Sequence, residues 1–169
     1  ILLFMSTLRT IRDVHNMEVQ RQQRALEKRR QQTERLSLQM MQTLALTVEA
    51  KDEYTRGHSH RVAEYAALIA KELHWSPEKI LKLKYAAHLH DIGKVGIPDT
   101  ILNKPTRLTP EEYAVTKEHT VIGSEILKNI TLLKQSADVA RHHHERYDGK
   151  GYPDGLKGTD ISLYARIIA

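Results

Sequence analysis

Histidine is the residue type in this sequence that is best suited to chemistry. Ten of the 169 residues are His, and nine of these lie between residues 58 and 144. The chain has no Cys, which excludes disulfides, zinc–thiolate sites and thiol catalysis. Any metal site must therefore use His, Asp and Glu side chains, and such a donor set favours iron, manganese or zinc.

The strongest metal-binding signal combines an adjacent His and Asp with a run of three His. His90 and Asp91 stand where Gly93 is predicted to end a helix, so both could reach one cation. A lone pair of this kind is weak evidence, and dipole stabilisation at a helix end is the plain alternative for the run of His. Together with Asp91 as a bridging carboxylate, five His would give two cations three ligands each: His58, His90, His119, His143 and His144.

Such a site would be suited to phosphate chemistry. Two cations about 3.5–4 Å apart can activate a bridging hydroxide and clamp a phosphate. Lys94 follows Asp91 by three residues, and a cation beside the metals could contact a phosphate oxygen. A solvated surface lysine is the alternative interpretation of Lys94.

The first part of the chain is predicted to be one long helix. Residues 4–50 contain no Gly and no Pro and are rich in good helix formers. A heptad register places four residues on an interrupted seam, which indicates pairing with a second copy of the chain: Val19, Leu26, Thr33 and Met40. Residues 20–35 carry a net charge of +4 from six basic and two acidic residues, which suggests a solvated helix face or, alternatively, contact with a membrane surface.

The rest of the sequence predicts a compact helical domain. An apolar stripe from Val62 to Leu73 is typical of an amphipathic helix over residues 58–73. Ser76-Pro77 and Thr109-Pro110 predict two further helix starts, the first helix running to about Asp91. Another helix is expected over residues 133–146, followed by a glycine-rich loop. No segment alternates like a strand, so the predicted fold class is all-α.

Two segments resemble a known family. Residues 90–94 (HDIGK) resemble the HD superfamily of metal-dependent phosphohydrolases. The longer segments 90–99 (HDIGKVGIPD) and 143–153 (HHERYDGKGYP) resemble an HD-GYP domain, which is named after the motif that stands here as Gly151-Tyr152-Pro153. The likeness runs from about residue 45 to the end of the sequence.

This resemblance implies a helical bundle around two or three metal ions, often iron, which hydrolyses cyclic di-GMP to linear pGpG and often on to GMP. By position, His58, His90 and Asp91 match the ligands of one metal. Asp91 bridges to the second, whose matched ligands are His119, His143 and His144. Lys94 matches a lysine that contacts the substrate phosphate. The Gly151-Tyr152-Pro153 loop matches a motif near the site that is linked to partner contacts, whereas His142 lies outside the pattern.

Two departures from the family pattern affect these expectations. Members with three metals carry a Glu four residues before the first His ligand, where this sequence has Tyr54, which favours two metals. A further Asp ligand of the family is expected beyond Ala169. Since the sequence begins with Ile1 rather than Met, it is expected to be a piece of a longer protein.

We therefore predict a linker or coiled-coil helix over residues 1–48 and an HD-GYP domain, incomplete at its C-terminus, over residues 49–169. The predicted function is that of a bacterial cyclic di-GMP phosphodiesterase with two divalent metal ions, Fe or Mn. The helix is expected to form a homodimer and to regulate the domain, and GGDEF-type or other signalling proteins are expected partners. No nucleic-acid polymer is expected to bind. The expected location is cytoplasmic, with or without a tether to the inner membrane or an upstream sensor. The alternatives are a catalytically silent interaction module and a phosphohydrolase of another nucleotide.

Overall fold

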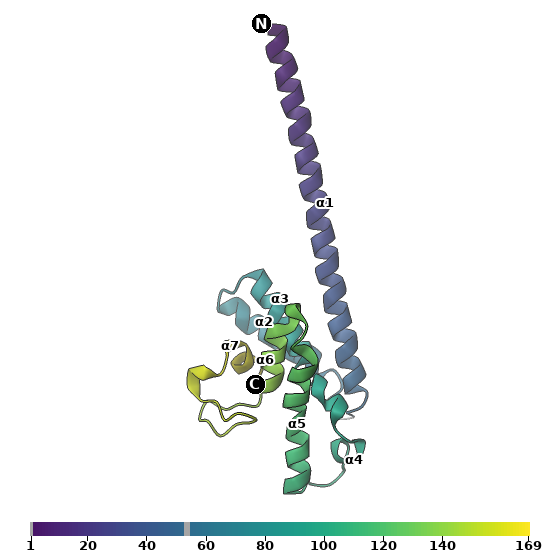
Figure 1. Ribbon diagram of the computed structural model, residues 1–169, viewed down its shortest axis with the longest axis vertical. Helices are drawn as coiled ribbons and strands as arrows, with labels where there is room; N and C mark the ends of the chain where they lie inside the picture. Colours follow the sequence, from purple (N-terminus) through teal and green to yellow (C-terminus); the bar gives the residue numbers. More distant parts are fainter. Residues whose placement is uncertain (1, 53–54) are drawn as a thin grey trace. The chain divides into compact units, whose positions relative to one another are not determined.

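The computed structural model describes residues 2–52 and 55–169, and within these ranges it is helical and contains no strand (Figure 1). The prediction of an all-α fold is confirmed. The α-helices are α1 (Leu2–Glu49), α2 (His58–Glu72), α3 (Pro77–Leu89), α4 (Asp99–Leu102), α5 (Pro110–Leu127), α6 (Lys134–His142) and α7 (Leu163–Ile168). The described residues also form three short 3₁₀ helices between them: η1 (Ile92–Gly96), η2 (Thr131–Leu133) and η3 (Gly158–Asp160).

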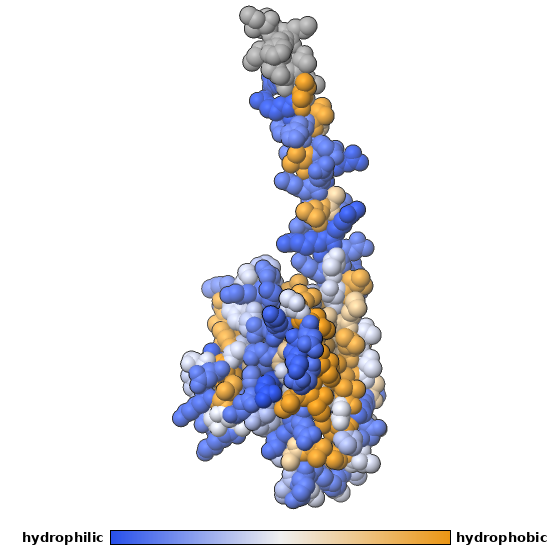
Figure 2. Space-filling model, viewed as in Figure 1, coloured by the Kyte–Doolittle hydropathy of each residue, from blue (hydrophilic) through white to orange (hydrophobic). Residues whose placement is uncertain are grey.

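The chain divides into two compact units, one up to Gln39 and one from Met40 to Ala169. The first unit is the N-terminal part of α1, and most of its hydrophobic residues from Ile11 onward are exposed, for example Leu26 at 70%. Figure 2 shows mostly hydrophilic side chains along this stretch, interrupted by separate hydrophobic ones. Among the described residues, no helix combines the length and the apolar character needed to cross a bilayer.

The core of the second unit lies among α2, α3, α6 and α7. The side of α2 that faces this core consists of small residues: Ala63, Ala66, Ala67 and Ala70. Of the predicted stripe, Ala66 is buried and Val62 packs partly against the core, whereas Tyr65 at 65%, Ile69 at 46% and Leu73 at 49% are exposed. That part of the prediction is wrong, because alanines let α2 approach α3 closely and large side chains would not fit between them.

The two predicted helix starts are confirmed. Ser76 caps α3 by accepting a hydrogen bond from the N–H of Lys79 at 3.4 Å. Thr109 accepts one from the N–H of Glu112, and the Glu112 carboxylate accepts one from the N–H of Thr109, which completes a capping box at the start of α5. These caps fix the starts of the two helices that lead to His90 and His119.

Two predicted helix ends need correction. Helix α3 ends at Leu89, and Gly93 lies inside η1 rather than terminating the helix. Gly93 is required for close packing instead, because a Cβ atom there would lie 1.9 Å from the carbonyl oxygen of His119 on α5. Helix α6 ends at His142 rather than near residue 146, so His143 and His144 lie just beyond the helix.

Candidate metal centre

Asp91 lies between two groups of side chains that could each hold a cation. One group consists of His58, His90 and Asp91. The other consists of Asp91 with His119, His143 and His144. Within each group the ligand atoms lie within 4.8 Å of one another. All six residues singled out as metal ligands from the sequence are therefore brought together, from α2, the end of α3, α5 and the end of α6.

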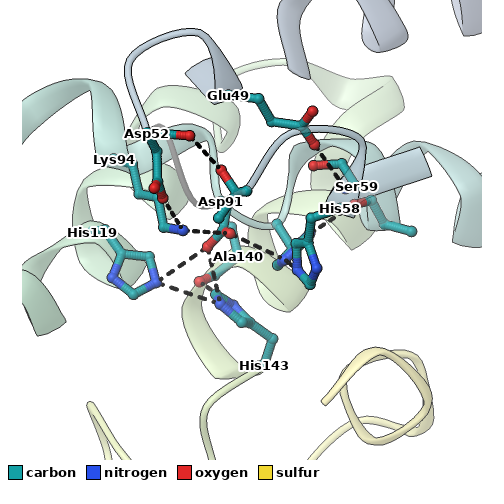
Figure 3. Close-up of polar contacts among 12 residues, drawn as sticks. Glu49, Asp52, His58, Ser59, Asp91, Lys94, His119, Ala140 and His143 are labelled. Atoms are coloured by element: carbon teal, nitrogen blue, oxygen red, sulfur yellow. Dashed lines mark hydrogen bonds and ion pairs between the residues drawn. The ribbon is translucent and has the colours of Figure 1, made fainter. Parts of the chain in front are cut away.

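The Asp91 carboxylate turns one oxygen to each group (Figure 3). Its Oδ1 lies 3.5 Å from Nε2 of His119 and 3.7 Å from Nε2 of His143. Its Oδ2 lies 3.4 Å from Nε2 of His90 and 2.9 Å from Nζ of Lys94. A carboxylate in this position could serve as a ligand to two cations at once.

The second group has a donor arrangement that fits a cation. His119 Nδ1 lies 2.6 Å from the carbonyl oxygen of Thr116, and His143 Nδ1 lies 3.0 Å from that of Ala140. A carbonyl only accepts, so each neutral ring carries its proton on Nδ1 and a lone pair on Nε2. The two Nε2 atoms face each other at 3.4 Å. Two lone pairs cannot bond to each other, and a cation between them would satisfy both.

The first group has the same feature on one of its two rings. His90 Nδ1 lies 2.7 Å from the carbonyl oxygen of Ala87, so the neutral ring has its lone pair on Nε2, which lies 3.3 Å from Nε2 of His58. Burial lowers the pKa of His58. Burial acts in the same direction on His90, but the Asp91 charge outweighs it and raises the pKa of His90.

Burial also keeps the second group of imidazoles neutral. It lowers the pKa of His119 to about 4 and that of His144 to about 3, and it lowers the pKa of His143. Burial opposes ionisation of Asp91, but His90, His143 and Lys94 hold its pKa well below its usual range. Neutral imidazoles around an ionised carboxylate are the protonation states that bind a divalent cation.

Lys94 is not a solvated surface lysine, since only 15% of its side chain is exposed. Its Nζ lies 2.9 Å from Oδ2 of Asp91 and 2.9 Å from Oδ2 of Asp52 (Figure 3). Burial works against the charge, but the two carboxylates raise the pKa of Lys94. Asp52 is buried and was not singled out from the sequence. A carboxylate at the end of a polar helix gives no sequence signal that distinguishes it from a solvated one.

The Gly151-Tyr152-Pro153 loop packs directly on the second group. The Tyr152 ring stacks on the His144 ring, with centroids 4.8 Å apart and planes 23° apart. A Cβ at position 151 would lie 2.3 Å from the backbone nitrogen of Arg146 and 2.5 Å from the carbonyl oxygen of His144. The glycine therefore allows the loop to approach the backbone that carries a candidate ligand.

His142 belongs to neither group and takes part in a polar network with Asp138 and the loop residue Asp154. Its Nδ1 lies 2.9 Å from Asp138, and its Nε2 lies 3.0 Å from Asp154. Arg141 donates two hydrogen bonds to the same Asp154, and Glu145 accepts the N–H groups of Asp154 and Gly155. The expectation drawn from Tyr54 lies outside the described residues.

The comparison with family models places this chain in a known class. Residues 13–169 match the family described as HD domain. The chain belongs to the HD domain family, and the resemblance drawn from His90 and Asp91 is confirmed at that level.

Several curated relatives are similar to this chain over part of their own length. The chain is 44% identical over 133 residues to a cyclic di-GMP phosphodiesterase of Thermotoga maritima, covering 78% of this chain and 36% of that protein. It is 44% identical over 128 residues to the cyclic di-GMP phosphodiesterase response regulator RpfG of Xanthomonas campestris pv. campestris, covering 75% of this chain and 34% of that protein. It is 46% identical over 121 residues to the 3'3'-cGAMP-specific phosphodiesterase 3 of Vibrio cholerae, covering 72% of this chain and 26% of that protein. The matched segment thus spans about a third or less of these relatives.

Proposed function

We propose that this chain is the hydrolytic domain of a cyclic di-GMP phosphodiesterase. The observation that carries the proposal is the pair of facing lone pairs on His119 and His143 beside a shared carboxylate, Asp91. The HD domain match and the names of the curated relatives support a metal-dependent phosphodiesterase of the HD-GYP type.

The site is proposed to hold two divalent cations, Fe or Mn. His58, His90 and Asp91 would hold one, and His119, His143, His144 and Asp91 the other. Ligands that offer only imidazole nitrogen and carboxylate oxygen atoms suit these metals. Bound cations would supply Lewis-acid stabilisation of a phosphate and activation of water.

The protein's own residues would fix the phosphodiester for in-line attack. Lys94 lies beside Asp91 and would place a positive charge near a non-bridging phosphate oxygen. The backbone carbonyls of Ala87, Thr116 and Ala140 hold the imidazole rings in place before substrate arrives, so little reorganisation is needed. The proposed products are linear pGpG and then GMP.

A second substrate is a specific alternative. Relatives named as 3'3'-cGAMP-specific phosphodiesterases are 46% and 39% identical to the matched part of this chain, which is similar to the values for the relatives named for cyclic di-GMP. A catalytically silent module that keeps the fold and acts through partners is the remaining alternative. Helix α1 is proposed to pair with a second copy and to regulate the domain.

The test measures turnover and bound metal in the protein that contains this sequence, under anaerobic conditions with Fe(II) or Mn(II). Asp91→Asn halves the donor capacity of the one residue shared by both groups and removes its charge. We expect loss of bound metal and a fall in turnover of more than about 100-fold, beyond what loss of an outer hydrogen-bond partner costs.

Asp160→Asn is the matched control, because Asp160 is exposed in η3 and belongs to neither group. It should leave metal content and turnover unchanged. Near-wild-type turnover of Asp91→Asn would contradict the proposed site.

A competition experiment would decide the substrate, with equimolar cyclic di-GMP and 3'3'-cGAMP and with the products separated by chromatography. Bound metal without hydrolysis of either would favour the silent module.

A further inference from the structure

Helix α2 begins at the candidate ligand His58 but does not cap its own start. The N-cap residue Gly57 adopts φ = 69°, makes no side-chain capping bond, and the first turn contains no acidic residue. The first N–H groups of a helix have no partner within the helix. The start of α2 therefore needs acceptors from another part of the chain.

Glu49, the last residue of α1, supplies them. Its Oε2 accepts a hydrogen bond from the N–H of Gly57 at 2.7 Å, and its Oε1 accepts one from the N–H of Ser59 at 2.8 Å. The two bonds flank His58 on both sides along the backbone, and Figure 3 shows Glu49 above Ser59 and His58. The carboxylate also places a negative charge at the positive end of the α2 dipole.

Glu49 is buried, with 8% of its surface exposed. Burial alone would raise its pKa, but the hydrogen bonds from Ser59 and Gly57 lower the pKa of Glu49. A buried carboxylate with both oxygens bonded to one helix start holds a defined position, whereas a solvated one would not.

The segment that follows Glu49 is tied to η1 and to Ile97, the residue after it. Lys51 donates hydrogen bonds to the carbonyl oxygens of Ile97 at 2.6 Å and Val95 at 3.0 Å. Asp52 pairs with Lys94. Movement of the end of α1 would therefore act on His58 through Glu49, while the next turn of the chain stays attached to η1.

We propose that Glu49 is a positioning residue, which holds the metal ligand His58 in place against His90 and Asp91 and couples it to the last turn of α1. This inference rests on the proposed function, since it takes these three residues to bind a cation. The inference adds to the proposed function a contact through which α1 would act on the His58 group and not on the His119 group.

The experiment is Glu49→Gln in the protein that contains this sequence. An amide side chain has one acceptor atom, and its NH₂ group would face an N–H donor, so one of the two bonds is lost. We expect faster hydrogen exchange at the Gly57 and Ser59 amides. In a Co(II) titration followed by visible absorption, we expect the affinity of the His58 group to fall by about 10- to 100-fold, while the His119 group binds as in the wild type.

Glu64→Gln is the matched control. It is the same change within α2 itself, and it breaks the 2.8 Å ion pair between Glu64 and Lys84 of α3 without touching the helix start. This variant should bind Co(II) like the wild type. Glu49→Asp keeps the charge but is shorter, so it should give an intermediate affinity and serves as the second variant if Glu49→Gln does not fold.

Each outcome separates the two proposals. Wild-type Co(II) binding at both groups in Glu49→Gln would overturn the positioning role and leave the proposed function intact. Equal weakening of both groups, or equal weakening by Glu64→Gln, would show a general loss of stability and would also overturn it. A wild-type protein that binds no Co(II) would overturn the proposed function and this inference together.

Discussion

Three imidazoles of the centre have different partners on their two nitrogens. In His90, His119 and His143, Nδ1 bonds a carbonyl oxygen three residues earlier in the chain, those of Ala87, Thr116 and Ala140. A carbonyl at that spacing is supplied by the helical turn before the residue. The turn of α3, α5 or α6 just before each His therefore also sets its tautomer and directs Nε2 towards Asp91, which is the task of outer hydrogen-bond partners in metal sites.

Gly93 is the residue on which the approach of η1 to α5 depends. In Gly93→Ala, the new Cβ would lie 1.9 Å from the His119 carbonyl oxygen and 2.5 Å from the backbone nitrogen of Gly123. Backbone atoms cannot move aside as a flexible side chain can, so η1 must shift from α5 and carry Asp91 away from His119. We expect a loss of about 1–3 kcal/mol in the free energy of unfolding, measured by urea denaturation, together with weaker metal binding.

Gly96→Ala is the control within the same 3₁₀ helix. The three atoms nearest to its Cβ would all belong to the side chain of Ile122, with Cδ1 at 2.9 Å, and that end of the side chain can rotate. We expect a smaller loss of stability and unchanged metal affinity. If Gly93→Ala were no worse than Gly96→Ala, the close backbone approach would not be what positions Asp91.

At the scale of elements, the loop after α6 is held by backbone contact. In Gly151→Ala, the Cβ would lie 2.4 Å from the Cα of Glu145 and 2.3 Å from the backbone nitrogen of Arg146. The loop must then move outward, and Tyr152 with it, away from His144. We expect metal affinity in the His119 group to fall by about 10-fold, because His144 loses its stacking partner. Isothermal titration with Mn(II) measures this.

Lys150→Ala is the matched control for the loop, because Lys150 is the exposed neighbour of Gly151. It should leave Mn(II) affinity unchanged. An unchanged affinity in Gly151→Ala as well would mean that the stack of Tyr152 on His144 does not position the ligand.

The sequence predicted those elements whose signals are local. The caps at Ser76 and Thr109 depend on residues within one turn, and both are confirmed. The predicted buried face of α2 was wrong at Tyr65, Ile69 and Leu73, because alanine patterning has little contrast and close helix packing decides which side is covered. Glu49 and Asp52 could not be found, since their partners on α2 and η1 are distant in sequence.

At the scale of the whole molecule, the proposed pairing of α1 with a second copy depends on its heptad seam. Leu26 lies on that seam and is 70% exposed. In Leu26→Glu, pairing would bury a carboxylate without a partner. We expect the dissociation constant of the dimer to rise by at least about tenfold, or 1.4 kcal/mol, measured by sedimentation equilibrium.

Gln31→Glu adds the same charge on the side away from the seam and should leave the dimer intact. Equal dimer stability in both variants would show that Leu26 does not lie in the contact. A monomeric Leu26→Glu protein with wild-type turnover would show that the site works without pairing.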